Sequence, residues 1–160
     1  MSNIVVYTDG SSRGNPGPGG YGTVMMSGQY RKELSQGFVK TTNNRMELLA
    51  VIVALEEIKN AGANVTVYSD SKYVVDSIEK KWVFGWQKKN FKDKKNPDLW
   101  KRFLKIFPKH KLQMVWVKGH ANNTENERCD KLAVDAAKGD NLIHDLGFEN
   151  PPSGPLFKND

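Results

Sequence analysis

The order of the apolar patterns along the chain is the feature that most constrains its fold. Three strand-like segments come first, at residues 4–9, 21–26 and 31–40, and short glycine-containing turns join them. The pattern then becomes helical over residues 44–59 and alternates between strand and helix from there on. This succession is typical of an α/β protein with a mixed sheet.

The second half of the chain supplies the remaining elements. Strands are predicted at residues 65–69 and 112–117, and helices at residues 71–80, from Asn96-Pro97 to about residue 107, and from Thr124 onward. Thr124 and Glu127 form a predicted capping box. We therefore expect a five-stranded mixed sheet flanked by helices, with three antiparallel strands and two added in parallel through right-handed crossovers.

Composition indicates one ordinary soluble domain. The chain has 160 residues, of which 38% are hydrophobic and 26% charged. The longest apolar run, residues 48–55, is too short to span a bilayer, and no secretory signal is visible. The single cysteine fits a reducing cytosol. We expect a monomeric cytoplasmic protein without a membrane partner, with one domain over residues 1–139 and an irregular tail over residues 140–160.

Positive charge is concentrated in one segment. Residues 79–96 hold seven lysines and two acidic residues, most of the excess of +6 that the whole chain carries. Such a segment suits a polyanion, although a solvated lysine-rich loop would have the same composition. The tryptophans outside this segment, Trp100 and Trp116, are expected in the core.

Four carboxylates occupy positions where an α/β sheet can bring them together. Asp9 and Asp70 end predicted strands, Glu47 lies in the first turn of the apolar helix, and Asp130 lies on the last helix. Each has a structural alternative: Asp9 in a turn, Glu47 in a cap pair with Asn44, Asp70 as a helix cap, and Asp130 on a solvated helix face. Four converging acids would repel one another, and a divalent cation resolves that conflict. Oxygen-only ligands favour Mg²⁺, with Mn²⁺ as a substitute, and suggest two-metal phosphodiester chemistry.

Longer motifs point to a known family. The segments "YTDGSSRGNPGPGGYG", "TTNNRMELLA", "SDSKYV", "KKWVFGWQKKNFKDKKNPDLW" and "WVKGHANNTENERCDKLA" occur in this order between residues 7 and 133. With them the chain resembles ribonuclease H of the bacterial type I class. The resemblance implies an endonuclease that hydrolyses the RNA strand of RNA–DNA hybrids and leaves 3′-hydroxyl and 5′-phosphate ends.

The resemblance also assigns roles to residues. It implies that Asp9, Glu47, Asp70 and Asp130 bind the metal and that His120, in a loop, assists proton transfer or product release. It implies substrate contacts by the four residues Asn15, Asn43, Asn44 and Arg45, with Asn126 as a further candidate near the site. Amide side chains suit this task because they hydrogen-bond to 2′-hydroxyls, the groups that distinguish RNA from DNA.

The lysine-rich segment resembles the basic protrusion of this family, here residues 80–96. Its implied contacts to the hybrid are Trp82, Trp86, Lys88, Lys89 and Lys92, of which the lysines would bind phosphates of the DNA strand. This protrusion is shorter than in familiar bacterial members, and Phe91 stands where a tryptophan is common. The alternatives are a catalytically silent module that only binds hybrids, and a related nuclease that acts on DNA junctions or ends.

Overall fold

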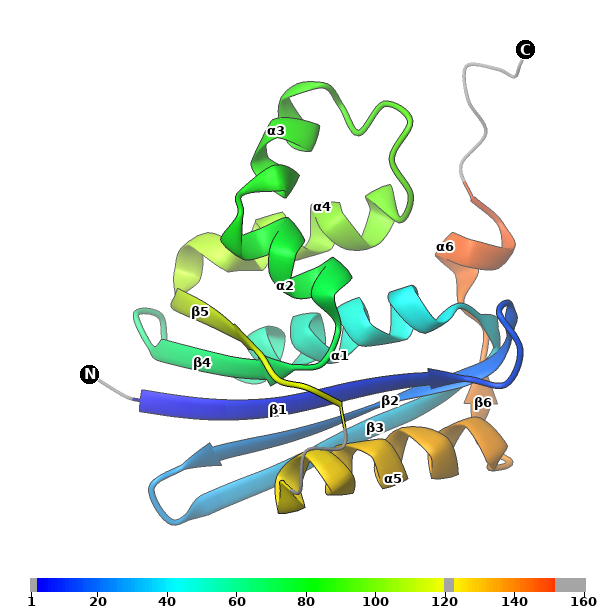
Figure 1. Cartoon of the computed structure of the whole chain (residues 1–160), viewed down its shortest axis with the longest axis horizontal. Coiled ribbons are helices and arrows are strands. Elements are labelled where there is room, and N and C mark those ends of the chain that lie inside the picture. The colour runs from blue at the N-terminus through cyan, green and yellow to red at the C-terminus, as the bar shows by residue number, and fades with distance from the viewer. Residues whose placement is uncertain (1–2, 120–122, 152–160) are drawn as a thin grey trace.

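One mixed sheet organises the molecule (Figure 1). The structure, a computed structural model, describes residues 3–119 and 123–151. Over these residues the sheet has six strands in the order β5-β4-β1-β2-β3-β6. The strands are β1 (Asn3–Ser12), β2 (Gly17–Ser27), β3 (Tyr30–Thr41), β4 (Asn64–Ser69), β5 (Lys111–Trp116) and β6 (Leu142–Ile143).

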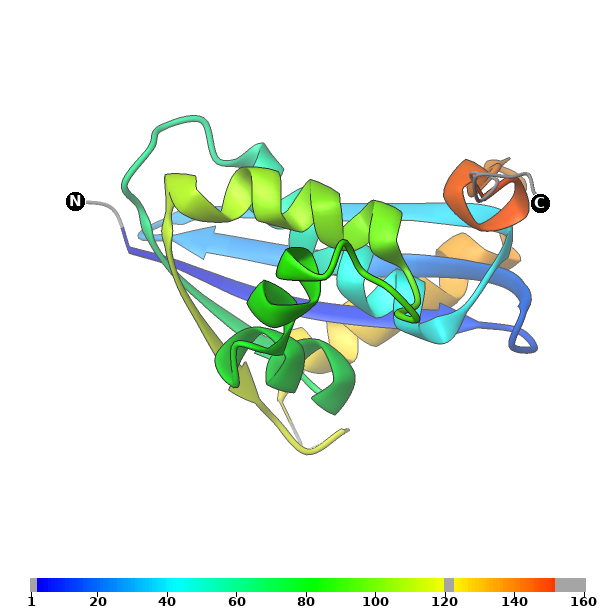
Figure 2. The same ribbon diagram turned by 90° about the horizontal axis from the view of Figure 1, so that it is seen from above.

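Helices cover both faces of this sheet. They are α1 (Asn43–Glu57), α2 (Lys72–Glu79), α3 (Trp82–Lys88), α4 (Pro97–Ile106), α5 (Thr124–Lys138) and α6 (Leu146–Glu149), with a 3₁₀ turn η1 (Phe107–Lys109). In Figure 1, α1 to α4 lie on one side of the sheet and α5 on the other, and Figure 2 shows α4 lying over α1. The expected architecture, a mixed sheet between helices, is confirmed, but the expected number of five strands is wrong, because the sheet has six strands over the described residues.

The strand directions also agree with the prediction for the first five strands. β1, β2 and β3 form an antiparallel meander, and β4 and β5 add in parallel beside β1. Each parallel addition needs a crossover, which α1 and the segment from α2 to η1 provide. This arrangement places the carboxyl ends of β1, β4 and β5 at one edge of the sheet.

The chain after Gly139 departs from the prediction. Residues 140–151 are not wholly irregular, because Leu142 and Ile143 pair in parallel with Gly37 and Phe38 of β3, and α6 follows. A strand of two residues has no periodicity that a sequence could display. It forms because β3 offers an unpaired edge for its backbone groups. Residues 152–160 of the expected tail lie outside the described residues.

Two helix starts differ from their predicted caps. The Thr42 hydroxyl accepts the bond from the Arg45 N–H at the start of α1, so the cap pair suggested for Asn44 and Glu47 is not formed. At α5 the Asn123 side chain accepts from the second and third residues of the helix, which replaces the predicted capping box. In each case the cap lies one or two residues before the expected position. At α1 this means that the Glu47 side chain does not take part in capping.

The lysine-rich segment is a short helix followed by a tight loop that packs back on the core. α3 and this loop stand away from the sheet in Figure 1. The Phe91 side chain, which belongs to this loop, is buried. The partly buried Trp86 packs edge-on against Trp100, with ring centres 5.9 Å apart. The Trp82 side chain is 47% exposed. Aromatic side chains thus anchor the segment while its lysines remain in solvent.

The two tryptophans expected in the core behave differently. Trp100, on α4, is fully buried against Tyr73 of α2 and Trp86 of α3, as predicted. Trp116 is 43% exposed, so the prediction for it is wrong. The edge strand β5 ends there, Lys72 lies over the ring at 4.7 Å, and the indole N–H donates to the Asp70 carbonyl at 3.2 Å. These contacts hold the ring beside the sheet edge where the carboxylates lie.

This difference in burial predicts different effects on stability. Trp100→Ala should lower the free energy of unfolding by about 3–5 kcal/mol, because it leaves a large cavity in the core. Trp116→Ala should lower it by about 1 kcal/mol or less, since the ring is half in solvent. Urea denaturation of the two variants and the wild type measures both values. Equal losses for the two variants would contradict the placement of Trp116.

Candidate active site

Two parallel strands carry the first two carboxylates to one place. β1 and β4 pair in parallel with Tyr7 opposite Tyr68, so Asp9 and Asp70 each lie two residues further along the chain, at the same level. The paired tyrosine rings stack with centres 5.1 Å apart and fix this register. Asp70 directly follows β4, whereas Asp9 does not end its strand as predicted, because β1 continues to Ser12 in its pairing with β2. The sheet itself therefore holds the two acids side by side.

A close approach of two backbones adds the third carboxylate. A Cβ atom at Gly10 would lie only 2.4 Å from the backbone nitrogen of Glu47, so a side chain at this position would exclude α1. The glycine lets the first turn of α1 rest directly on the backbone of β1, two residues before the strand ends at Ser12. Glu47, 5% exposed, then points at Asp9 and Asp70.

The three carboxylates form a cluster that suits a metal ion. One oxygen from each of Asp9, Glu47 and Asp70 lies within 4.8 Å of the others. Asp130, on α5, lies outside this group, but its negative charge is one of those that raise the pKa of the Asp9 carboxyl. The structure thus brings three of the four predicted ligands together and sets the fourth at the margin.

Burial and mutual repulsion disturb the titration of this cluster. Burial, then the negative charges of Asp70 and Asp130, raise the pKa of the Asp9 carboxyl to about 8. Burial, then the charges of Asp9 and Asp70, raise the pKa of Glu47 well above its ordinary value. The Gly10 N–H, 2.9 Å from Asp9, opposes both shifts. The carboxylates therefore lack a nearby positive charge that would stabilise their ionised forms.

Unpaired oxygens support the same conclusion. Within the described part of the chain, Glu47 Oε1, Asp70 Oδ1 and Asn126 Oδ1 are buried and have no hydrogen-bond partner. Asp9, Asp70, Asn126 and Gly119 border a pocket with room for about one water molecule. Buried oxygens without donors are what a hard divalent cation requires, so the residues fit Mg²⁺ or Mn²⁺. Asn126 joins this site from the first turn of α5.

The predicted substrate asparagines lie beside the cluster. Asn43 and Asn44 are exposed at the first turn of α1, one turn before Glu47. Asn15, in the loop between β1 and β2, is also exposed, and its side-chain oxygen accepts from the Asn43 N–H at 2.9 Å. Asn15 therefore holds the start of α1 while its amide nitrogen remains available.

The structure places Arg45 elsewhere. Its side chain is only 3% exposed and lies between Asp98 and Asp145, to which it makes ion pairs at 2.7 and 2.8 Å. The guanidinium is therefore directed into the protein and away from solvent. The sequence offered no sign of this, because its partners lie 53 and 100 residues further along the chain.

The remaining predicted residues lie on the lysine-rich segment or outside the described residues. Lys88, Lys89 and Lys92 are exposed together with Trp82, while Trp86 is partly buried and has Lys94 over its ring at 5.1 Å. His120 lies outside the described residues. Gly119, just before it, is placed so that a Cβ atom would lie 3.2 Å from an Asp70 carboxylate oxygen.

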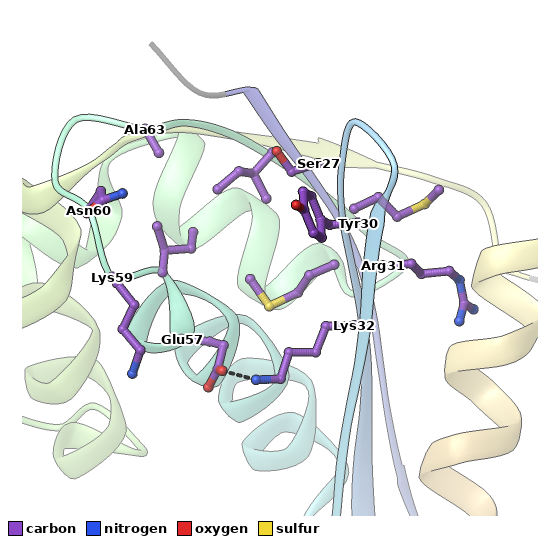
Figure 3. A pocket seen from close by; sticks show the side chains of 12 residues that line it. Ser27, Tyr30, Arg31, Lys32, Glu57, Lys59, Asn60 and Ala63 are labelled. Carbon is purple, nitrogen blue, oxygen red and sulfur yellow. Dashed lines mark hydrogen bonds and ion pairs between the residues drawn. The ribbon is translucent and has the colours of Figure 1, made fainter.

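A larger cavity lies apart from all of these residues. It has a volume of about 840 Å³ and lies between the turn joining β2 to β3 and the end of α1. Met25, Tyr30 and Lys59 line it, and Lys32 pairs with Glu57 at its border (Figure 3). It contains none of the carboxylates or asparagines described above, so this cavity is separate from the candidate active site.

Comparison with known proteins agrees with the fold. The family model RNase H matches residues 1–138, which extend from β1 through α5. The chain belongs to the RNase H family. The resemblance drawn from the motifs is thereby confirmed.

Relatives extend over nearly the whole chain. Ribonuclease H of Desulforamulus reducens is 54% identical over 151 residues, which cover 91% of this chain and 94% of the relative. Ribonuclease H of Syntrophus aciditrophicus is 52% identical over 150 residues, which cover 91% and 86%. The similarity therefore includes residues beyond the family model.

Solved structures share the fold. LC9-RNase H1, a type 1 RNase H with the type 2 active-site motif, superposes with a TM-score of 0.79 at 32% identity, covering 93% of this chain and 80% of that one. LC11-RNase H1, solved in complex with an RNA/DNA hybrid, superposes with a TM-score of 0.57 at 27% identity, covering 84% and 96%.

The contact at Gly10 generates a prediction. Gly10→Ala should lower Mg²⁺ affinity about tenfold or more, because α1 must move and carry Glu47 away from Asp9 and Asp70. Isothermal titration of the variant measures this, and a thermal melt should show lost stability. Gly85→Ala is the control, since nothing lies within 4 Å of its added Cβ. Unchanged metal binding by Gly10→Ala would contradict the proposed contact.

The raised pKa of Asp9 predicts how stability depends on pH. Without metal, the folded protein holds a proton on Asp9 up to about pH 8, whereas the unfolded chain releases it near pH 4. The metal-free protein should therefore lose stability as the pH rises from 4 to 8. Asp9→Asn should flatten this dependence and be the more stable form at pH 8.

Denaturation in chelator at several pH values tests this expectation. Asp135→Asn, which removes an exposed acid on α5, serves as the control and should retain the wild-type slope. A wild-type protein with equal stability at pH 5 and pH 8 would show that the cluster is not strained by its charges.

Proposed function

We propose that this protein is a Mg²⁺-dependent endonuclease that hydrolyses the RNA strand of RNA–DNA hybrids and leaves 3′-hydroxyl and 5′-phosphate ends. The observation that carries the proposal is the cluster of Asp9, Glu47 and Asp70, with unpaired buried oxygens, in a member of the RNase H family. The hybrid bound by LC11-RNase H1 supports the choice of substrate.

The four acids are the proposed metal ligands, with Asp130 supplying a ligand from α5. Divalent ions bound there would activate water and stabilise the departing 3′-oxygen. The protein contributes rigidity: two acids are fixed by paired strands, and Glu47 is fixed by the contact at Gly10. Asn126 can hold a water molecule in the small pocket that it shares with Asp9 and Asp70.

Recognition of the hybrid is proposed to involve two regions. Asn15, Asn43 and Asn44 are exposed beside the carboxylates, where amides can contact 2′-hydroxyls of the RNA strand. Trp82, Trp86 and the lysines of residues 80–96 are proposed to contact the DNA strand. His120 is proposed to assist proton transfer or product release. Its neighbour in the sequence, Gly119, borders the pocket at Asp70, which supports this assignment.

The wider setting is proposed as well. We take the enzyme to be monomeric and cytoplasmic, with a catalytic domain that includes β6 and α6 in addition to residues 1–139. Among the described helices, none is both long and apolar enough to cross a membrane.

Asp70→Asn separates catalysis from binding. The variant should lose detectable cleavage of a labelled RNA–DNA hybrid in Mg²⁺ yet retain hybrid binding in chelator, because it removes a ligand and adds no bulk. Wild-type protein should spare duplex DNA and duplex RNA under the same conditions. Normal cleavage by the variant would refute the metal assignment, and cleavage of duplex DNA at a comparable rate would refute the specificity. Absence of cleavage by the wild type would favour a silent binding module.

Removal of lysines tests the DNA-strand contacts. Replacing Lys88, Lys89 and Lys92 together by Ala should weaken hybrid binding and reduce the slope of log affinity against log salt by about 2–3, roughly 0.9 for each lost phosphate contact. Fluorescence anisotropy over a salt series measures the slope. The control replaces Lys59, Lys109 and Lys138, which are exposed elsewhere and change the net charge equally. Equal slopes for the two triple variants would exclude a specific contact by this segment.

A further inference from the structure

Arg45 uses every N–H donor of its guanidinium inside the protein. Nε and Nη2 donate to Asp145 at 2.8 and 2.9 Å, and Nη1 and Nη2 donate to Asp98 at 2.8 and 2.7 Å. The fifth donor lies 3.4 Å from the side-chain oxygen of Asn96. A buried charge paired in this manner on two sides fixes the relative position of the elements that supply the carboxylates.

Those elements come from three distant parts of the chain. Arg45 belongs to the first turn of α1, Asp98 to the first turn of α4, and Asp145 to the segment between β6 and α6. Figure 1 shows the starts of α1 and α4 and all of α6 at one end of the molecule. Thr41, at the end of β3, also donates to Asp145 at 2.7 Å, which fixes the carboxylate to the sheet. We refer to Arg45, Asp98 and Asp145 as the arginine clamp.

Gly147 closes over the arginine clamp. A Cβ atom at this residue would lie 1.9 Å from Asp98 Oδ2 and 2.9 Å from Arg45 Nη2. The first turn of α6 thus rests directly on the ion pair, and even one methyl group would displace the Asp98 carboxylate.

The arginine clamp also borders the proposed binding face. A cavity of about 390 Å³ lies beside it, lined by Asn15 and Asn44 on one side, by Lys95 and Asn96 on another, and by Phe148 of α6. Arg45 joins α1 to α4, which follows the lysine-rich segment. This ion pair therefore fixes the distance between the asparagines of α1 and the end of that segment.

We propose that Arg45 is a positioning residue: with Asp98 and Asp145 it holds the asparagines at the start of α1 at a fixed distance from the lysine-rich segment, so that residues 140–150 form part of the hybrid-binding machinery. This inference rests on the proposed function. It goes beyond it by giving a role in substrate binding to a segment that contributes no catalytic group.

The arginine clamp should affect binding more than chemistry. Glu47 is held separately, by the contact of α1 with Gly10, so the carboxylate cluster keeps its geometry when the clamp loosens. Asn43 and Asn44 lie further from that contact, at the N-terminus of the helix. Loosening the clamp should therefore raise KM and leave kcat nearly unchanged.

Charge makes the test sharp, because Asp145→Asn removes a negative charge. Electrostatics alone would then strengthen binding to a polyanion. A positioning role predicts the opposite, since the variant disrupts the pairing with Arg45. Gly147→Ala changes no charge at all and displaces Asp98 by contact.

The experiment measures KM and kcat for hybrid cleavage in Mg²⁺, and hybrid affinity by fluorescence anisotropy in chelator, well below the melting temperature. Asp145→Asn and Gly147→Ala should each raise KM and the dissociation constant about tenfold, with kcat within about twofold of wild type. If a variant only unfolded in part, fewer active molecules would lower the apparent kcat and leave KM unchanged. Thermal melts monitor this.

Glu56→Gln is the matched control. Glu56 of α1 pairs with Arg102 of α4 at 2.7 Å, so it links the same two helices and its replacement removes the same charge, but at an exposed position away from the binding face. It should not raise KM. Wild-type KM for both clamp variants, or an equal rise for Glu56→Gln, would overturn the inference. A wild-type protein that binds no hybrid would instead refute the proposed function.

Discussion

Repulsion among buried carboxylates is the constraint on which the rest of this structure depends. Asp9, Glu47 and Asp70 place their oxygens within 4.8 Å of one another in partly buried surroundings, where like charges are costly. No single element could hold them there against that repulsion. The pairing of β1 with β4 and the packing of α1 on Gly10 do so together, because each contact prevents one of the carboxylates from moving away from the others.

Some of this arrangement could be predicted from the sequence. Asp9 and Asp70 each follow a β-branched run, and parallel strands of an α/β sheet end at a common edge, so their convergence follows from topology. Local chemistry also predicted α4, because Pro97 begins it at the expected residue. Assigning Glu47 needed the family resemblance, since the same spacing from Asn44 suggests a cap pair.

Other features depend on contacts that no local pattern reveals. The motif gives Arg45 the same expected role as its neighbours Asn43 and Asn44, but its ion-pair partners lie far along the chain. β6 exists only because β3 presents a free edge to it. Trp116 has the composition of a core residue, and only its place at the end of an edge strand leaves it half in solvent. In each case tertiary neighbours, and not propensity, decide the outcome.

The long separation between Arg45 and Asp145 has a consequence for the growing chain. A ribosome releases β1, α1 and β4, with Asp9, Glu47 and Asp70, well before residue 145 emerges, and closing a loop of this length waits for its second end. A nascent or prematurely ended chain would thus contain the residues of the acidic cluster before the arginine clamp could fix the distance between the asparagines of α1 and the lysine-rich segment. The order of synthesis would then delay a firm grip on nucleic acid until the polypeptide is nearly finished.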